Sequence, residues 1–230
     1  MSLPPGLFIS KKRGYKGQMA IKVNEIFHSI QGESSWSGLP CLFVRLTGCN
    51  LRCAYCDTGY AYEQGSLMEI SEIIERVRRT GCELVEVTGG EPLLQAETPR
   101  LLSGLLEAGF TVLLETNGSL DIGLADPGCA RIVDVKCPSS AMAQQNDLGN
   151  LQRLGERDEL KFVIGTREDY EFARAIVRTI PGVKCKINFS PIFNVIEARL
   201  LARWILEDRL PVRLNLQLHK FIWGPEAKGV

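Results

Sequence analysis

Two features that would place a protein on a nucleic acid or in a membrane are missing from this sequence. Lysine and arginine together number 27, as do aspartate and glutamate, so the formal net charge is zero. A neutral balance gives no electrostatic reason to expect nucleic acid or an anionic surface as a partner. No uninterrupted apolar run approaches the ~20 residues that a helix needs to span a bilayer. We therefore expect neither nucleic acid nor a membrane among its partners.

The sequence also lacks a secretory signal, an internal repeat and a linker that would separate two domains. Near the N-terminus the charges of Lys11, Lys12 and Arg13 follow the apolar stretch, whereas a secretory signal has the opposite order. Hydrophobic residues make up 45% of the chain, which is ordinary for a globular protein with a core. We expect a cytoplasmic protein with an N-terminal extension over residues 1–18 and a single domain over residues 19–230.

Short apolar runs alternate with helical patterns after the extension. The expected strands cover residues 21–27, 41–46, 84–88, 110–115, 131–135, 160–164, 184–189 and 212–216. Helical signals fall around residues 70–77, 98–106 and 194–205, where Asn194 and Glu197 resemble a capping box. Alternating strands and helices predict an α/β fold with parallel strands. Because a full (β/α)₈ barrel takes about 250 residues, we expect an abbreviated, partly open barrel of the (β/α)₆ type.

Eight cysteines are present, and most of them are isolated. In a reducing compartment this usage indicates that a subset ligates a metal or cofactor, rather than that disulfides form. The scattered cysteines are expected to be small core residues. They are Cys41, Cys82, Cys129, Cys137 and Cys185.

The remaining cysteines lie together in the segment GCNLRCAYCD. Cys49, Cys53 and Cys56 follow the apolar run CLFVRL with the spacing C-x₃-C-x₂-C. A [4Fe–4S] cluster usually takes four cysteines, so three would leave one iron open, as the metal is at catalytic sites. A closed zinc knot or a ferredoxin-type carrier needs a fourth ligand. The next cysteine is Cys82, and the next histidine is His219, one of only two in the chain.

Polar segments follow three further expected strands. Residues 88–92 read TGGEP, and the paired glycines let the backbone approach a ligand closely. Residues 115–118 read ETNG and residues 134–136 read DVK. The carboxyl ends of barrel strands are where such enzymes build their sites. Taken alone, TGGEP is a weak signal because Gly-Gly turns are common, and ETNG is also compatible with a plain strand and turn.

With these segments in this order, the chain resembles the radical S-adenosylmethionine (SAM) superfamily. An aromatic residue before the last cysteine is usual there. The resemblance implies a [4Fe–4S] cluster whose open iron binds SAM, with one-electron reduction cleaving SAM to methionine and a 5′-deoxyadenosyl radical. It also implies SAM-binding residues outside the cysteines. These are Tyr55, Gly90, Glu91, Asp134, Val135 and Lys136.

Two segments narrow the resemblance. FHSIQGES at residues 27–34 and FVRLTGCNLRCAYCDT at residues 43–58 are similar to the 7-carboxy-7-deazaguanine synthase family, and LQLHK at residues 216–220 resembles its closing strand. The resemblance implies ring contraction of 6-carboxy-5,6,7,8-tetrahydropterin to 7-carboxy-7-deazaguanine, with release of ammonia, in queuosine and 7-deazapurine biosynthesis. The radical would remove hydrogen from C6 of the pterin, and the product radical would regain it, so that SAM is regenerated.

The resemblance also implies roles for polar side chains near the cysteines. Arg45 offers a planar fork suited to a carboxylate, and Gln31 and Glu33 can read the amide and amino edge of a pterin. Thr58 offers a hydroxyl oxygen to Mg²⁺, which keeps most of its waters in proteins. Without the family, the first of these would be a solvent-facing strand residue and the others would belong to turns.

The C-terminal part of the chain completes the expected site. Gln217 and His219 are expected on one face of a strand, and the terminal carboxylate of Val230 is expected to reach the pocket. The substrate-binding residues implied are Ile30, Gln31, Gly32, Glu33, Arg45, Thr88, Gln217, His219 and Val230. The implied partners are the pterin, an electron donor such as flavodoxin or ferredoxin, and a second copy of the chain in a homodimer.

Two other interpretations stay open. An activase that generates a glycyl radical on a partner protein shares the cysteine spacing and the small size, but it gives no reason for SIQGE or LQLHK. A non-enzymatic iron–sulfur or zinc-binding domain would bind no SAM and would leave GGEP incidental. SAM binding and turnover of the pterin acid distinguish the three.

Overall fold

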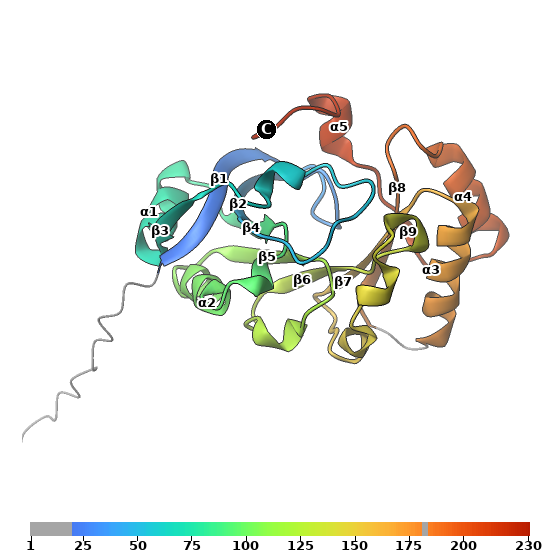
Figure 1. Cartoon of the computed structure of the whole chain (residues 1–230), viewed down its shortest axis with the longest axis horizontal. Coiled ribbons are helices and arrows are strands. Elements are labelled where there is room, and N and C mark those ends of the chain that lie inside the picture. The colour runs from blue at the N-terminus through green and yellow to red at the C-terminus, as the bar shows by residue number, and fades with distance from the viewer. Residues whose placement is uncertain (1–19, 181–183) are drawn as a thin grey trace, which may run out of the picture.

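The computed structural model describes residues 20–180 and 184–230, and the N-terminal extension expected over residues 1–18 lies outside them. Within the described residues, nine strands form one open sheet in the order β3-β1-β2-β4-β5-β6-β7-β8-β9 (Figure 1). The strands are β1 (Ala20–Ile30), β2 (Pro40–Leu46), β3 (Ser66–Glu69), β4 (Leu84–Gly89), β5 (Thr111–Thr116), β6 (Ala130–Asp134), β7 (Glu159–Ile164), β8 (Lys186–Pro191) and β9 (Arg213–Leu214).

The sheet is mostly parallel, as the sequence predicts. Strands β2 and β4 to β9 pair in parallel, each with the next in the sheet. The prediction of parallel strands is wrong for β1, which pairs antiparallel with β2 and with β3. Strand β3 itself was not predicted. It is four residues long and carries one buried side chain, Met68, so its sequence has too little apolar alternation to stand out.

Five α-helices connect or follow these strands in the described part of the chain. They are α1 (Ile70–Thr80), α2 (Thr98–Glu107), α3 (Arg167–Thr179), α4 (Ala198–Glu207) and α5 (Leu218–Ile222). Figure 1 shows α1 and α2 at one end of the sheet, and α3 and α4 side by side at the other. The connections from β5 to β6 and from β6 to β7 contain only short 3₁₀ turns. The barrel is therefore abbreviated in its helices as well as open in its sheet.

Side-chain hydrogen bonds cap one helix, and a cap predicted for another helix is wrong. Thr166 caps α3 by accepting from the amide of Asp169, whose side chain accepts in return from the amide of Thr166. The expected capping box of Asn194 and Glu197 is wrong. Glu197 occupies the position before α4 without a side-chain cap, and Asn194 adopts a left-handed conformation with φ of 60°.

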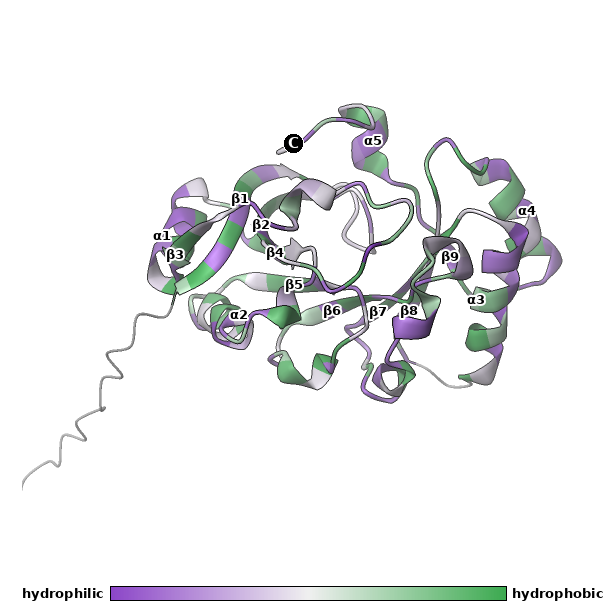
Figure 2. Cartoon of the chain, in the orientation of Figure 1, coloured by the Kyte–Doolittle hydropathy of each residue, from purple (hydrophilic) through white to green (hydrophobic). Residues whose placement is uncertain are grey.

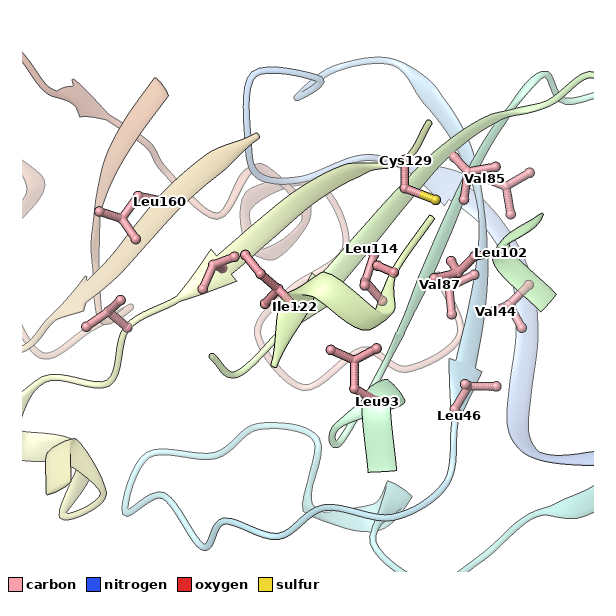
Figure 3. Packing of buried hydrophobic residues seen from close by; sticks show 14 of the residues in the cluster. Val44, Leu46, Val85, Val87, Leu93, Leu102, Leu114, Ile122, Cys129 and Leu160 are labelled. Atoms are coloured by element: carbon pink, nitrogen blue, oxygen red, sulfur yellow. The ribbon is translucent and has the colours of Figure 1, made fainter. Parts of the chain in front are cut away.

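The apolar core lies between the sheet and its helices. Alternate residues of the central strands, such as Val85, Val87 and Leu114, point toward α2, where Figure 3 shows them with Leu102. Figure 2 shows green and purple segments alternating along α1 and α3, as expected for helices with one apolar face. All five isolated cysteines are buried, which confirms their assignment to the core. No helix in the described ranges is long and apolar enough to cross a bilayer.

The opposite face of the sheet changes character along each strand. Its floor is a smaller apolar cluster that includes Leu84, Leu113 and Ile132. Two residues further on, where the side chain returns to the same face, the residues are Glu86, Glu115 and Asp134. Charged groups therefore gather at the carboxyl ends of parallel strands, above an apolar floor.

Candidate functional site

A cavity of about 1570 Å³, its open mouth included, lies over these strand ends. It is lined by almost all of the residues that the sequence assigns to a site. They are Ile30, Gln31, Gly32, Glu33, Arg45, Cys49, Cys53, Tyr55, Cys56, Thr58, Thr88, Gly90, Asp134, Lys136, Gln217, His219 and Val230. Glu91 and Val135 do not line it. Segments more than 180 residues apart in the sequence thus meet at one opening.

The loop after β2 brings its three thiols to this cavity. Cys49 and Cys53 are half-buried and Cys56 is exposed, in contrast to the five buried cysteines of the core. The amide of Leu51 lies 3.4 Å from the Cys49 sulfur and the Asn117 side-chain amide 3.8 Å from it. Burial raises the pKa of Cys53, and nearby Lys136 opposes that shift. Three accessible thiols with amide donors around them fit an iron–sulfur cluster held by three cysteines.

Gly90 of the TGGEP turn is required by close packing against the cysteine loop. A Cβ atom on Gly90 would lie 2.4 Å from the carbonyl oxygen of Gly48 and 2.5 Å from Cβ of Cys49. The amide of Glu91 also donates to the carbonyl of Gly48 at 2.8 Å. Any side chain at position 90 would therefore push the cysteine loop away.

Glu91 is fully buried and holds two loops together. Its carboxylate accepts from the hydroxyl of Thr116 and from the backbone amides of Asn117 and Leu93, at 2.7–3.0 Å. Burial raises its pKa, while these donors oppose the shift. With its oxygens occupied inside the protein, Glu91 acts on the cavity through the position of Asn117 rather than through contact.

Residues after β6 form a polar wall near Cys53. Lys136 donates to Asp134 at 2.7 Å, and both side chains are mostly buried. The second oxygen of Asp134 and the hydroxyl of Tyr55 are buried without a partner. Buried polar atoms normally have a partner, so these two mark a place for a polar ligand. Val135 packs in the apolar core instead.

A second group of charges lies on the central strands. Lys161 forms ion pairs with Glu33 at 2.6 Å and with Glu115 at 2.8 Å. Gln31 donates through Nε2 to Glu86 and accepts at Oε1 from the amide of Glu33 at 3.0 Å. Burial alone would lower the pKa of Lys161, but the neighbouring carboxylates outweigh it and raise that pKa. This lysine is thus an ammonium ion inside the cavity wall.

Arg45 lies in an aromatic setting at the edge of the cavity. It pairs with Glu25 at 2.8 Å, and its guanidinium lies 5.6 Å from the ring centre of Phe27 and 6.0 Å from that of Tyr60. Burial alone would lower its pKa, but Tyr60 and Glu25 outweigh burial and raise it. Lys228, near the end of the chain, lies 4.7 Å from the Tyr60 ring. Cations therefore face the cavity from both β2 and the C-terminal segment.

The C-terminal segment reaches the cavity, but not as the predicted strand. Strand β9 confirms only two residues of the strand expected over residues 212–216, and the shared strand face of Gln217 and His219 is wrong. The amide of Leu218 instead donates to the carbonyl of Gly32 at 2.8 Å, and α5 begins there. A Cβ on Gly32 would lie 2.1 Å from the His219 ring, so this glycine admits the histidine. Burial lowers the pKa of His219.

Several cavity residues were not predicted. Glu86 and Lys161 lie within strands that read as ordinary buried strands, and Tyr60 and Lys228 lie in segments without a motif. Glu115 belongs to the predicted ETNG segment, but it was given no role of its own. A charge inside an apolar strand was the available signal, since such residues are seldom buried without a partner. Their partners lie on other segments of the chain, so these pairings can be recognised only in the folded structure.

Comparison with known sequences identifies a superfamily and a family for this chain. Residues 43–133 match the Radical SAM superfamily. A 7-carboxy-7-deazaguanine synthase of Chlorobaculum tepidum is 50% identical over 91% of this chain and 97% of its own length. The chain belongs to the 7-carboxy-7-deazaguanine synthase family. A second member, from Koribacter versatilis, is 45% identical over 91% of this chain and 100% of its own length.

Comparison of structures leads to the same family. The crystal structure of QueE from Escherichia coli superposes with a TM-score of 0.74 and 25% identity, covering 87% of this chain and 95% of that one. Membership of the 7-carboxy-7-deazaguanine synthase family makes this chain a radical SAM lyase and implies a [4Fe–4S] cluster and SAM as cofactors. It therefore decides against the glycyl-radical activase and the non-enzymatic metal-binding domain.

Proposed function

We propose that this chain converts 6-carboxy-5,6,7,8-tetrahydropterin to 7-carboxy-7-deazaguanine with release of ammonia. The proposal rests on family membership together with one structural observation. Gln31 and Glu33 of the β1–β2 turn line the same cavity as Cys49, Cys53 and Cys56. Groups suited to a pterin thus share one opening with groups suited to a cluster.

Cys49, Cys53 and Cys56 would hold the cluster, which supplies the electron for reductive cleavage of SAM and so the radical that starts the reaction. Gly90, directly after β4, lets the backbone approach the cysteine loop closely. Asp134 and Tyr55, each with a buried oxygen lacking a partner, would complete the SAM side of the cavity, and Lys136 balances the Asp134 charge. These residues give the SAM side of the cavity its charge and its shape.

On the other side, the substrate would be oriented by groups of opposite charge. The Glu33 carboxylate accepts hydrogen bonds and suits the guanidine-like edge of a pterin, which presents donors. Arg45 and Lys228 suit its carboxylate, and the Tyr60 ring keeps both cations close to the cavity. Excluding water from this opening would strengthen each of these interactions.

Thr58 is proposed as a protein ligand of Mg²⁺. It follows the last cluster cysteine by two residues, lines the cavity, and has its hydroxyl 3.7 Å from the Cys56 sulfur. Asp57 next to it is paired with Lys220 at 2.8 Å and is therefore occupied. Since Mg²⁺ keeps several waters and needs few protein ligands, one hydroxyl beside a substrate carboxylate is a sufficient protein contribution.

The remaining expectations are proposals of the same kind. An electron donor such as flavodoxin or ferredoxin would reduce the cluster, and the chain would act as a homodimer in the cytoplasm. Residues 19–230 would form one catalytic domain, with residues 1–18 as an extension that carries no site motif. Val230, 40% exposed at the cavity, would bring its terminal carboxylate to the substrate.

Anaerobic turnover tests the main proposal. Reconstituted protein is incubated with the pterin acid, SAM, dithionite and Mg²⁺, and products are identified by mass spectrometry. We expect 7-carboxy-7-deazaguanine and ammonium in equal amounts. Intact pterin after prolonged incubation, in a sample whose cluster cleaves SAM, would contradict the proposed substrate while leaving the superfamily chemistry in place.

A further inference from the structure

Two ionisable residues in the cavity wall have no place in the function described so far. Glu86 on β4 and Lys161 on β7 come from strands that are separated by β5 and β6. The side chain of Lys161 is 7% exposed, and Glu86, counted as a whole residue, is 2% exposed. Burying a charge is costly unless it is paired and hydrogen-bonded. Their partners therefore show what these two residues hold in position.

Each partner lies on the cavity side of the sheet. Lys161 bridges Glu33 and Glu115, and Glu115 lies diagonally next to Glu86 on the same face of the neighbouring strand. Glu86 in turn accepts from Nε2 of Gln31, whose Oε1 accepts from the backbone amide of Glu33. The five residues thus form a ring of neighbours, which runs from Glu33 through Lys161, Glu115, Glu86 and Gln31 back to Glu33.

The ring determines which way the Gln31 carboxamide faces. Its oxygen must meet the Glu33 amide and its nitrogen must meet Glu86, because a rotated carboxamide would place donor against donor and acceptor against acceptor. Glu33 is held from both sides as well, by Lys161 at one oxygen and by Nε2 of Gln217, 3.0 Å from the other. The two groups that would read the pterin edge therefore have fixed donor and acceptor directions.

The charges of the ring balance best when one of its carboxyl groups is protonated. Three carboxyl groups face a single ammonium group, which pairs with Glu33 and Glu115, and among the described residues no cation pairs with Glu86. A buried carboxyl group without a cation partner favours its neutral form. Burial, and then repulsion by Glu115, raise the pKa of Glu86. Burial alone would raise the pKa of Glu115, but Lys161 outweighs burial and lowers it.

We propose that Glu86 and Lys161 are positioning residues for the substrate, with Glu86 acting as a neutral carboxylic acid that donates to Glu115 and accepts from Gln31. This inference rests on the proposed role of Gln31 and Glu33 in reading the pterin. Neither positioning residue needs to contact the reacting atoms. Their effect is to hold in advance the polar groups that the substrate meets, which lowers the entropy cost of binding.

Two substitutions at position 86 distinguish the hydrogen bonding of a neutral acid from the volume that its side chain fills. In Glu86→Gln, the amide oxygen can accept from Gln31 and the amide nitrogen can donate to Glu115, so the ring stays closed. In Glu86→Leu, both bonds are lost at similar volume and Gln31 is free to rotate. Glu83→Gln is the matched control, since Glu83 is exposed and precedes the same strand outside the cavity.

Binding and turnover are measured on each cluster-loaded protein. The dissociation constant of the pterin acid is determined anaerobically with SAM present and no reductant, and kcat and KM follow after dithionite is added. We expect Glu86→Leu to weaken binding and raise KM on the order of tenfold, with a smaller effect on kcat. Glu86→Gln and Glu83→Gln should remain within about threefold of the parent protein, as one retained hydrogen-bond pattern allows.

The protonation state has its own signature. Difference infrared spectra of the parent protein minus Glu86→Gln should contain the C=O stretch of a protonated carboxyl group, which a carboxylate lacks. Equal losses of binding in Glu86→Gln and Glu86→Leu, or no loss in either, would overturn the inference. If Glu86→Leu does not fold, the infrared band together with retained binding in Glu86→Gln supports the inference, and absence of the band overturns it. Failure of the parent protein to turn over the pterin would instead concern the proposed function.

Discussion

The two faces of this sheet are built from alternate residues of the same strands, but one face is apolar and the other carries polar groups at the cavity. On the helix side, Val85 and Val87 of β4 are fully buried among apolar neighbours and contribute by removing surface from water. On the cavity side, Glu86 and Thr88 of that strand belong to a polar wall. A one-residue step thus changes a side chain's contribution from stability to ligand positioning. The faces should therefore respond differently to substitution.

The cysteines provide the largest expected contrast. Cys53→Ala removes one of three thiols at the cavity and should abolish SAM cleavage, because the remaining two cannot hold the cluster in place. Cys129→Ala, in the core, should retain SAM cleavage while lowering the free energy of unfolding by about 1–2 kcal/mol. Iron content and 5′-deoxyadenosine formation are the measurements. A requirement for Cys82, Cys129 or Cys137 equal to that for Cys53 would contradict an open iron position.

Neighbouring residues on β4 sharpen the comparison within one strand. Val87→Ala should lower the free energy of unfolding by about 2–3 kcal/mol, from lost burial and a small cavity, with turnover at low temperature retained. Thr88→Val keeps the volume but removes the hydroxyl, which lies 3.5 Å from Glu115. It should lower kcat/KM roughly tenfold and change stability by less than about 1 kcal/mol. Thermal unfolding and steady-state kinetics give both values, and an exchange of the two phenotypes would refute the assignment of the faces.

The ion site tests whether the loop after the cysteines contributes to the cavity chemistry. Thr58→Ala removes the proposed Mg²⁺ ligand and should lower turnover roughly fivefold while weakening the response to added Mg²⁺, because one hydroxyl contact is lost. Thr58→Ser retains the oxygen and should behave as the parent protein. Turnover is titrated with Mg²⁺ after treatment with a chelator. If chelation leaves the parent protein fully active, Thr58 has no such role.

The chain ends give the smallest expected effect. A short extension beyond Val230 moves the terminal carboxylate away from the cavity and should raise KM for the pterin about threefold, as loss of one partly exposed ionic contact would. Deleting residues 1–18, which carry no site motif, should leave KM and kcat unchanged. The same assay serves both variants. An extension with unchanged KM would show that Val230 lies at the cavity without contacting substrate.

Local patterns in the sequence predicted much of this site. The spacing of Cys49, Cys53 and Cys56 and the Gly-Gly turn before Glu91 are contiguous motifs, and the chemistry of each requires those residues at those positions. The strands β2 and β4 to β8 were predicted within two residues at most ends, since buried strands read as apolar runs. Such features depend on neighbours along the chain.

Features that depend on distant neighbours were predicted less well. The antiparallel pairing of β1 and the short β3 are set by the sheet rather than by their own sequences. The segment of Gln217 and His219 alternates like a strand, but its backbone bonds to Gly32 and turns into α5. Lys161 could not be assigned because its partners, Glu33 and Glu115, lie on other segments. Tertiary contacts override local propensity in each case.

The number of product molecules formed per molecule of SAM tests the account most directly. A ring contraction in which SAM is regenerated uses it as a cofactor, whereas other uses of the same cysteine motif consume it. With the pterin acid in large excess over SAM, cluster-loaded protein, dithionite and Mg²⁺, we predict many molecules of 7-carboxy-7-deazaguanine for each SAM present. One 5′-deoxyadenosine and one methionine released per product, or SAM cleavage with no product, would contradict the account.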